Sequence, residues 1–205
     1  MAIPSSNPAK PDSGRAGTFR IHVFGHPSAR PEQIAAEFGG IVGAGEPSEC
    51  DLAIFVINPA SGISPESIEQ WEGLNDSMVP RLIAVTGLEN PEADFDDAVL
   101  IANRVLDLTV TPYLVLHDEA GLACALISLE DLKVHDYTTS SPKISESEPE
   151  HKTLVEEFRN EYLAALDVMG EDGFAAGLMF PAIPVWIEKG IGVDIVKNYI
   201  QQLAS

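Results

Sequence analysis

The sequence predicts an α/β protein in which helices cover both faces of a doubly wound, mostly parallel sheet. Residues 52–57 and 81–85 are short apolar runs, interrupted only by Arg81, and such runs are typical of strands that are covered on both faces. A segment with helical spacing lies between them and opens with Ser-Pro-Glu at 64–66, which suits a helix cap and a first helical turn. Alternation of buried strands with helices favours a parallel sheet.

The segment before these runs predicts one more strand and one more helix. Residues 19–24 alternate apolar and polar side chains and stop at Gly25, which indicates a strand followed by a turn. Pro31 suits the first position of a helix, and we expect that helix to span residues 31–38. Residues 39–49 are rich in Gly, Glu and Pro and are expected to form a loop.

The middle of the chain predicts two helices and a further strand. In the helix that begins at residues 64–66, helical spacing continues through Ile68, Trp71, Asn75 and Met78. Pro91 is expected to open the next helix, whose apolar face comprises Phe95, Val99, Ala102 and Leu106. Residues 113–116 are apolar again and are expected to form a third buried strand.

The second half of the chain predicts a small subdomain at about residues 122–170, inserted as a β-hairpin plus a helix. Two short strands, 122–127 and 132–137, are expected around a bend, followed by a polar segment, 138–152, that we expect to be a mobile linker. A long amphipathic helix should follow, with an apolar face from Leu154 to Met169.

The ends of the chain complete the expected organisation. A strand at 182–187 and a helix at 193–203 are expected near the C-terminus. Residues 1–17 are Pro-, Ser- and Gly-rich without a period and are expected to be a disordered tail. We therefore expect one α/β domain over residues 18–205.

The composition restricts the kinds of partner. There are 12 Lys and Arg against 32 Asp and Glu, a net charge of −20, which argues against direct nucleic-acid binding because such binding neutralises phosphates with Lys and Arg. No apolar run reaches the ~18 residues of a membrane span, and no secretory signal is recognised at the N-terminus, so we expect a cytoplasmic protein without membrane contact. Cys50 and Cys124 stand apart, and no two histidines have helical metal spacing, so we expect no disulfide framework and no metal site.

From Cys50 onward the chain resembles the GTPase (G) domain of bacterial elongation factor G, a translational GTPase. Asp-Leu-Ala-Ile-Phe-Val-Ile-Asn at 51–58 and the loop to Pro65 are similar to the family strand that ends in D-A-x-x-G-V-x-P. Further similarities are V-P-R at 79–81, A-D-F-D at 93–96, the hairpin at 125–137 and Gly-Val at 192–193. The resemblance implies a P-loop-NTPase-like, G-domain-like fold.

The phosphate-binding motif of that family, G-x-x-x-x-G-K-[ST], is not preserved. After the first strand the chain reads Gly25-His26-Pro27-Ser28-Ala29-Arg30-Pro31-Glu32, so Pro and Glu stand where the Lys and the Mg²⁺-binding hydroxyl are required. Only residues 39–50 fill the space of the switch regions, and they contain no Asp-x-x-Gly. In a second alignment, Gly25-His26 matches the Pro-Gly-His of switch II, and the P-loop itself is missing.

The base-recognition motifs are altered as well. Asn-Lys-x-Asp falls on 86–89, where only Thr86 and Glu89 keep part of the family role, and Ser-Ala-x falls near Trp186. The candidate remnants of a nucleotide site are therefore Gly25, His26, Ser28, Arg30, Thr86, Glu89 and Trp186. We expect no catalytic residues, and we expect neither GTP nor Mg²⁺ as a cofactor.

The sequence thus predicts a non-catalytic, pseudo-GTPase-like domain that acts as a protein-binding or regulatory module, with a protein partner that the sequence does not identify. Two alternatives stay open. One is a GTP-binding, translation-factor-like protein with an unorthodox nucleotide site. The other is an acidic scaffold that binds a basic protein, for which the net charge of −20 is the argument.

Overall fold

The computed structural model describes residues 19–43, 49–139, 141–170 and 172–204. Its first sheet contains five strands in the order β2-β1-β3-β4-β9, and every neighbouring pair is parallel. The strands are β1 (Ile21–Gly25), β2 (Ile41–Val42), β3 (Leu52–Ile57), β4 (Arg81–Val85) and β9 (Ala182–Pro184). Counted within this sheet alone, the order is 2-1-3-4-5, one of the two common orders of doubly wound proteins.

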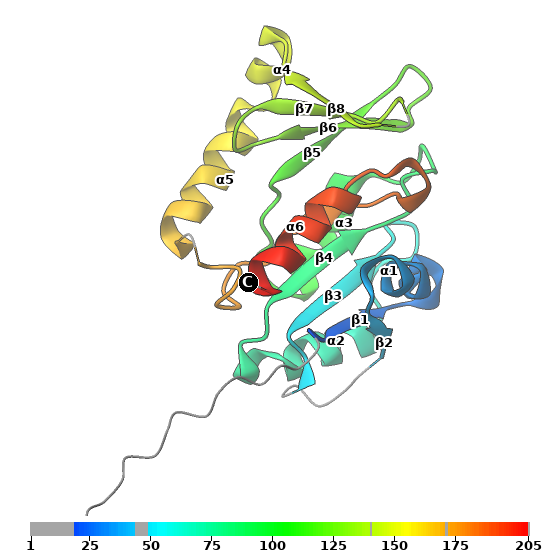
Figure 1. Ribbon diagram of the computed structural model, residues 1–205, viewed down its shortest axis with the longest axis vertical. Coiled ribbons are helices and arrows are strands. Elements are labelled where there is room, and N and C mark those ends of the chain that lie inside the picture. The colour runs from blue at the N-terminus through cyan, green and yellow to red at the C-terminus, as the bar shows by residue number, and fades with distance from the viewer. Residues whose placement is uncertain (1–18, 44–48, 140, 171, 205) are drawn as a thin grey trace, which may run out of the picture.

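Helices cover both faces of the first sheet (Figure 1). One face packs against α1 (Pro31–Phe38) and α6 (Val193–Ala204), and the other packs against α2 (Pro65–Gly73) and α3 (Phe95–Val105). Strand β3 shows the reason, since its residues alternate between the two cores and none is more than 3% exposed. A strand that is apolar on both sides needs a helix layer on each side.

The second sheet is antiparallel and contains four strands in chain order. They are β5 (Tyr113–His117), β6 (Ala123–Ser128), β7 (Lys133–Asp136) and β8 (Lys143–Glu146), followed by α4 (Pro149–Leu154) and α5 (Glu156–Met169). In Figure 1 this sheet lies above the first, and α5 runs down along one side. Apolar residues of β6 join the same core as α6, so the two sheets share one interior.

The connection from α3 into the second sheet is attached to the edge of the first. Val110 donates its N–H to the Phe180 carbonyl oxygen at 3.0 Å and accepts the Ala182 N–H at 2.8 Å. The chain therefore passes alongside β9 before it enters β5, and this short contact fixes the position of the second sheet relative to the first.

The structure confirms the predicted α/β fold class and several predicted elements. The strands at 52–57 and 81–85 and the helix at 31–38 have the predicted bounds. The two strands of the hairpin and the final helix lie within one residue or two of the prediction. Boundaries of helices and strands differ by this much between assignment methods.

Three predictions in the middle of the chain are wrong. The strand at 113–116 belongs to the antiparallel sheet and not to the parallel one. Helix α3 begins at Phe95 and not at Pro91, because the Asp94 side chain caps it by accepting the Asp96 N–H at 2.8 Å. Helix α2 ends at Gly73, and Met78 lies outside it with a positive φ of 50°.

The segments predicted to be irregular contain regular structure. The predicted loop 39–49 holds β2, which adds a fifth strand to the parallel sheet. The predicted linker 138–152 holds β8 and the first residues of α4, so it extends the second sheet instead of joining two separate parts. The tail predicted at residues 1–17 lies outside the described residues.

Candidate functional site

The carboxyl ends of β1 and β3 form the switch point of the first sheet. The chain continues from β1 to β2 on one side, whereas β3 lies on the other side. Ligands of doubly wound proteins bind in the crevice at such a point. The loop at residues 26–30 joins β1 to α1 here, in the position of a phosphate-binding turn, which favours the P-loop alignment over the switch II alignment.

The loop begins close against the neighbouring strand. A Cβ atom on Gly25 would lie 2.6 Å from the Val56 carbonyl oxygen, so only glycine fits this position. One turn of 3₁₀ helix follows at Pro27–Ala29. The Nδ1 atom of His26 lies 2.7 Å from Ser28 Oγ and accepts the Ser28 N–H at 3.2 Å. His26 and Ser28 therefore bond to each other and stabilise the turn.

The backbone N–H groups of this turn are all used within the loop. Pro27 and Pro31 have no N–H group. The three residues between them donate to His26 Nδ1 from Ser28 (3.2 Å), to the His26 carbonyl from Ala29 (2.8 Å) and to the Pro27 carbonyl from Arg30 (3.0 Å). A phosphate-binding loop needs N–H groups that point at the ligand. Residues 27–31 have none to offer.

The guanidinium at the start of α1 is also engaged. Arg30 has a left-handed backbone, with φ of 61°, and its Nη2 forms an ion pair with Glu89 Oε1. Thr86 Oγ1 donates to the Ala29 carbonyl oxygen at 3.0 Å and lies 3.4 Å from that of Ile57. The segment expected to recognise a base therefore binds the loop expected to hold the phosphates.

Trp186 closes the other side of this site. It pairs with Ile191 through two backbone hydrogen bonds, of 3.0 and 3.1 Å, which fold the chain after β9 into a tight hairpin. The Lys189 ammonium lies 4.2 Å from the centroid of the Trp186 ring and donates to the Ala123 carbonyl oxygen at 3.2 Å. Lys189 thus contacts the indole ring and ties this hairpin to the second sheet.

The space enclosed by these groups is very small. Arg30, Thr86, Glu89 and Trp186 all line one cavity, whose volume is about 10 Å³. That volume accommodates roughly one water molecule, whereas sites for small ligands span about 300–1,000 Å³. In this conformation the cavity is far too small for a nucleotide base.

The structure brings the seven residues predicted from the sequence to one edge of the sheet, in two groups. Arg30, Thr86, Glu89 and Trp186 share the small cavity, whereas Gly25, His26 and Ser28 lie in the adjoining loop. No search for altered motifs would have found Asn58, which donates from Nδ2 to the Ser28 carbonyl oxygen at 3.4 Å. Its signal in the sequence is its position directly after the buried strand 52–57.

Two other classes of site were sought over the part of the chain that the structure describes. There, no group of three or more His, Cys, Asp or Glu side chains is arranged to hold a metal ion. Nor does any helix in the described ranges have the length and apolar character needed to cross a membrane.

Comparisons with known proteins agree with this architecture. No protein-family model matches the chain. Among curated proteins, it is 26% identical over 182 residues to the elongation factor G-like protein of Mycobacterium tuberculosis, in strains CDC 1551 / Oshkosh and ATCC 25618 / H37Rv. The match covers 77% of this chain but 24% of the relative, so the chain spans about a quarter of the relative's length.

The solved structures include a crystal structure from Thermus thermophilus that matches 80% of this chain and 30% of its own, with a TM-score of 0.66. Its sequence identity of 20% supports a likeness of fold alone. The chain is therefore elongation factor G-like in sequence and G-domain-like in fold.

Proposed function

We propose that this chain is a non-catalytic, pseudo-GTPase-like domain that acts as a protein-binding or regulatory module. The observation that carries the proposal is the state of the loop at residues 26–30, where the N–H groups that would cradle a phosphate are bonded internally. Prolines at both ends of the turn mean that a small movement of the loop would not supply the missing donors.

Three further observations support the absence of nucleotide chemistry. Arg30 is neutralised by Glu89, and an additional carboxylate, Glu32, stands in the first turn of α1, where it would repel a phosphate. Trp186 and its neighbours leave a cavity of about 10 Å³ at the expected position of the base. Phosphate and base recognition are thus altered on separate elements, so no single substitution would restore both.

The alternative is a GTP-binding protein with an unorthodox site, and one observation favours it. The Arg30 and Glu89 side chains are 38% and 41% exposed, and an exposed ion pair of this kind contributes only ~0–1 kcal/mol to stability. A nucleotide could therefore separate the pair at little cost. In that case Arg30 would be released to contact a phosphate group.

Thermal unfolding with and without millimolar GTP or GDP and Mg²⁺ separates these two functions. A ligand at 100 times its Kd stabilises the folded state by about 2.7 kcal/mol, a shift of roughly 5–11 °C for a chain of this size. We expect no shift here, while an elongation factor G measured in parallel shifts. A nucleotide-dependent shift that Arg30→Ala abolishes would establish the alternative.

The proposal also includes a cytoplasmic location and a protein partner. The two cysteines, Cys50 and Cys124, are both free thiols, which is the usual state of cysteine in a reducing compartment.

A further inference from the structure

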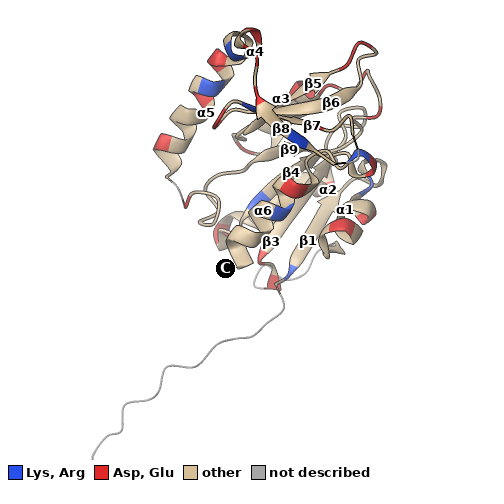
Figure 2. Cartoon of the chain, turned by 45° about the horizontal axis from the view of Figure 1, so that its top comes forward, with Lys and Arg blue, Asp and Glu red and all other residues tan. Residues whose placement is uncertain are grey.

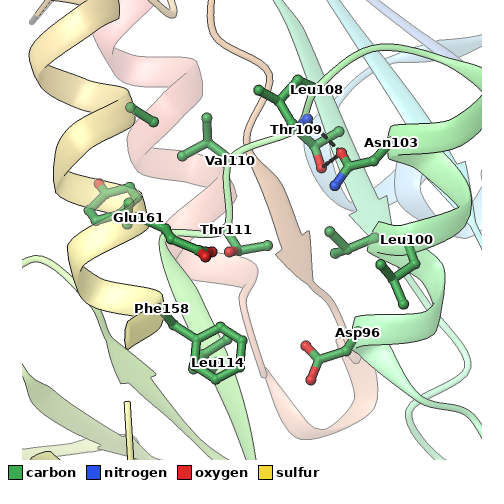
Figure 3. Close-up of a pocket in the computed structure, with 13 residues that line it drawn as sticks. Asp96, Leu100, Asn103, Leu108, Thr109, Val110, Thr111, Leu114, Phe158 and Glu161 are labelled. Carbon is green, nitrogen blue, oxygen red and sulfur yellow. Dashed lines mark hydrogen bonds between the residues drawn. The ribbon is translucent and has the colours of Figure 1, made fainter. Parts of the chain in front are cut away.

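A large apolar groove lies on the opposite side of the molecule's core from the closed nucleotide-like site, between α3 and α5. Its volume is about 580 Å³, and its floor is the segment 108–114 that leads into β5. Figure 3 shows Phe158 and Glu161 of α5 on one wall and Asp96 and Leu100 of α3 on the other. The groove is therefore bounded by two helices and one extended segment.

Large apolar side chains are exposed along this groove. Leu100, Leu108 and Phe158 line it and are 65%, 68% and 44% exposed. Single exposed apolar residues are ordinary, but several that converge on one hollow mark a binding surface. Each of the three comes from a different element, so the fold assembles this surface from segments far apart in the sequence.

The polar atoms of the floor already have partners. Asn103 Oδ1 accepts both the Thr109 N–H and the Thr109 hydroxyl, each at 2.7 Å. Because these groups are satisfied, apolar side chains can cover them without leaving a buried polar atom unpaired. The floor thus suits an apolar occupant.

The rim of the groove is negative. Asp96 and Glu161 stand on opposite walls, and no Lys or Arg among the described residues lines the groove. Burial at the groove, together with the nearby charges of Asp94 and Asp97, raises the pKa of Asp96 above its ordinary value. A cation placed beside Asp96 would relieve this repulsion, so the rim is complementary to Lys or Arg side chains.

We propose that this groove binds an amphipathic helix of another protein, with apolar residues on one face and Lys or Arg beside them. An amphipathic helix laid between two helices inserts apolar anchors at i, i+3 or i+4, and i+7. The inference deepens the proposed function and rests on it for the expectation that the partner is a protein.

Charge complementarity argues against a second copy of the chain as the occupant. Each copy carries a net charge of −20, and two such molecules repel one another at ordinary ionic strength. A basic helix instead gains from the same charges, both in its rate of encounter and in the pairing at the rim.

Selection of displayed helical peptides on the full chain tests the proposal. We expect enrichment of peptides with Leu or Phe at i, i+3 or i+4, and i+7 and with flanking Lys or Arg. The Kd of a selected peptide, measured by fluorescence anisotropy, should weaken at least tenfold with Leu100→Gln and again with Phe158→Ala. Leu154→Gln is the matched control, because Leu154 is 73% exposed and does not line the groove.

A second pair of variants tests the rim. Glu161→Gln should weaken the same peptide severalfold at low salt and less at high salt, since screening reduces the contribution of exposed charges. Glu119→Gln removes a carboxylate from a loop that does not line the groove and should leave the Kd unchanged. Thermal unfolding of each variant identifies any that fails to fold.

Defined results would overturn the proposal. They are a selection that enriches nothing, enrichment of acidic peptides, binding that Leu100→Gln and Phe158→Ala both leave intact, or self-association of the chain through Leu100. Nucleotide binding would overturn the proposed function and leave the groove result standing, so the two failures are distinguishable.

Discussion

Arg81 places a guanidinium in the interior of the first sheet, at only 2% exposure. The guanidinium carbon lies 4.6 Å from the Trp71 ring centroid and 4.3 Å from that of Phe180, so the cation is sandwiched between two aromatic rings. Its Nη1 donates to the Trp71 carbonyl oxygen at 3.1 Å and to Asn75 Oδ1 at 2.6 Å. Burial lowers the pKa of Arg81 from its ordinary value, and the charge of Asp107 opposes that effect.

Truncation of this side chain should be costly. Arg81→Ala removes both ring contacts, leaves a cavity and strips the Asn75 oxygen of its donor, so we expect a loss of about 3–4 kcal/mol in the free energy of unfolding. Arg81→Met keeps apolar contact with the rings and removes the buried charge, so its loss should be about half as large. Urea unfolding measures both, and equal losses would show that packing with the rings contributes little.

Elements differ in how far their sequence determines their place. Strand β3 is buried on both faces, and its apolar composition alone predicts both its bounds and a central position. Strand β5 has a similar composition, but its sheet is decided by pairing with β6, which composition does not encode. Strand β8 is exposed along its whole length and so lacks any apolar pattern by which it could be recognised.

The candidate site follows the same rule. The contacts within residues 26–30 are local, and proline positions in the sequence already predict the loss of N–H donors. The pairing of Arg30 with Glu89 joins two loops 59 residues apart, and only the family resemblance placed both at one site. The groove between α3 and α5 could not be predicted, because it depends on how the second sheet is positioned.

Strand β7 carries a titratable group into the second sheet. The His135 ring stacks edge-on against Tyr113, with centroids 5.5 Å apart. Burial lowers the pKa of His135 below its ordinary value of 6.5, and Lys133 lowers it further while Asp131 opposes the shift. The folded state therefore favours the neutral imidazole.

A pH dependence of stability follows from this shift. Below pH 6.5 the unfolded chain binds a proton at His135 more readily than the folded chain does, so the free energy of unfolding falls as the pH drops through that value. His135→Phe should remove this contribution. The stability difference between wild type and variant, measured by urea unfolding, should be constant above neutrality and change below pH 6.5. A difference that stays constant throughout would contradict the assignment.

At the scale of the whole molecule, charge opposes compaction. Carboxylates lie on the outer helices, including α1 and α5, and few cations stand among them (Figure 2). The ion pairs that the structure contains are exposed, such as Lys197 with Glu37 at 2.8 Å, and such pairs contribute little. A net charge of −20 therefore leaves unbalanced repulsion within the folded chain.

Salt should stabilise the protein for this reason. Raising NaCl from about 0.01 M to about 0.5 M shortens the screening length from about 30 Å to a few ångströms, and we expect the melting temperature to rise. Glu119→Lys, in an exposed loop, should raise the melting temperature at low salt and reduce its salt dependence. A melting temperature that is insensitive to NaCl would mean that the carboxylates are too far apart to repel.

The late arrival of β9 in the chain governs how the protein folds. Its partner β4 is complete at Val85, yet Ile83 cannot pair with Ala182 until the entire second sheet and α5 have been synthesised. Closing so long a loop delays the pairing, and such non-local contacts are slow to form. During synthesis, β4 therefore exposes an unpaired, apolar strand edge, and edges of this kind invite aggregation. The nascent chain should accordingly need protection by chaperones until its last helix leaves the ribosome.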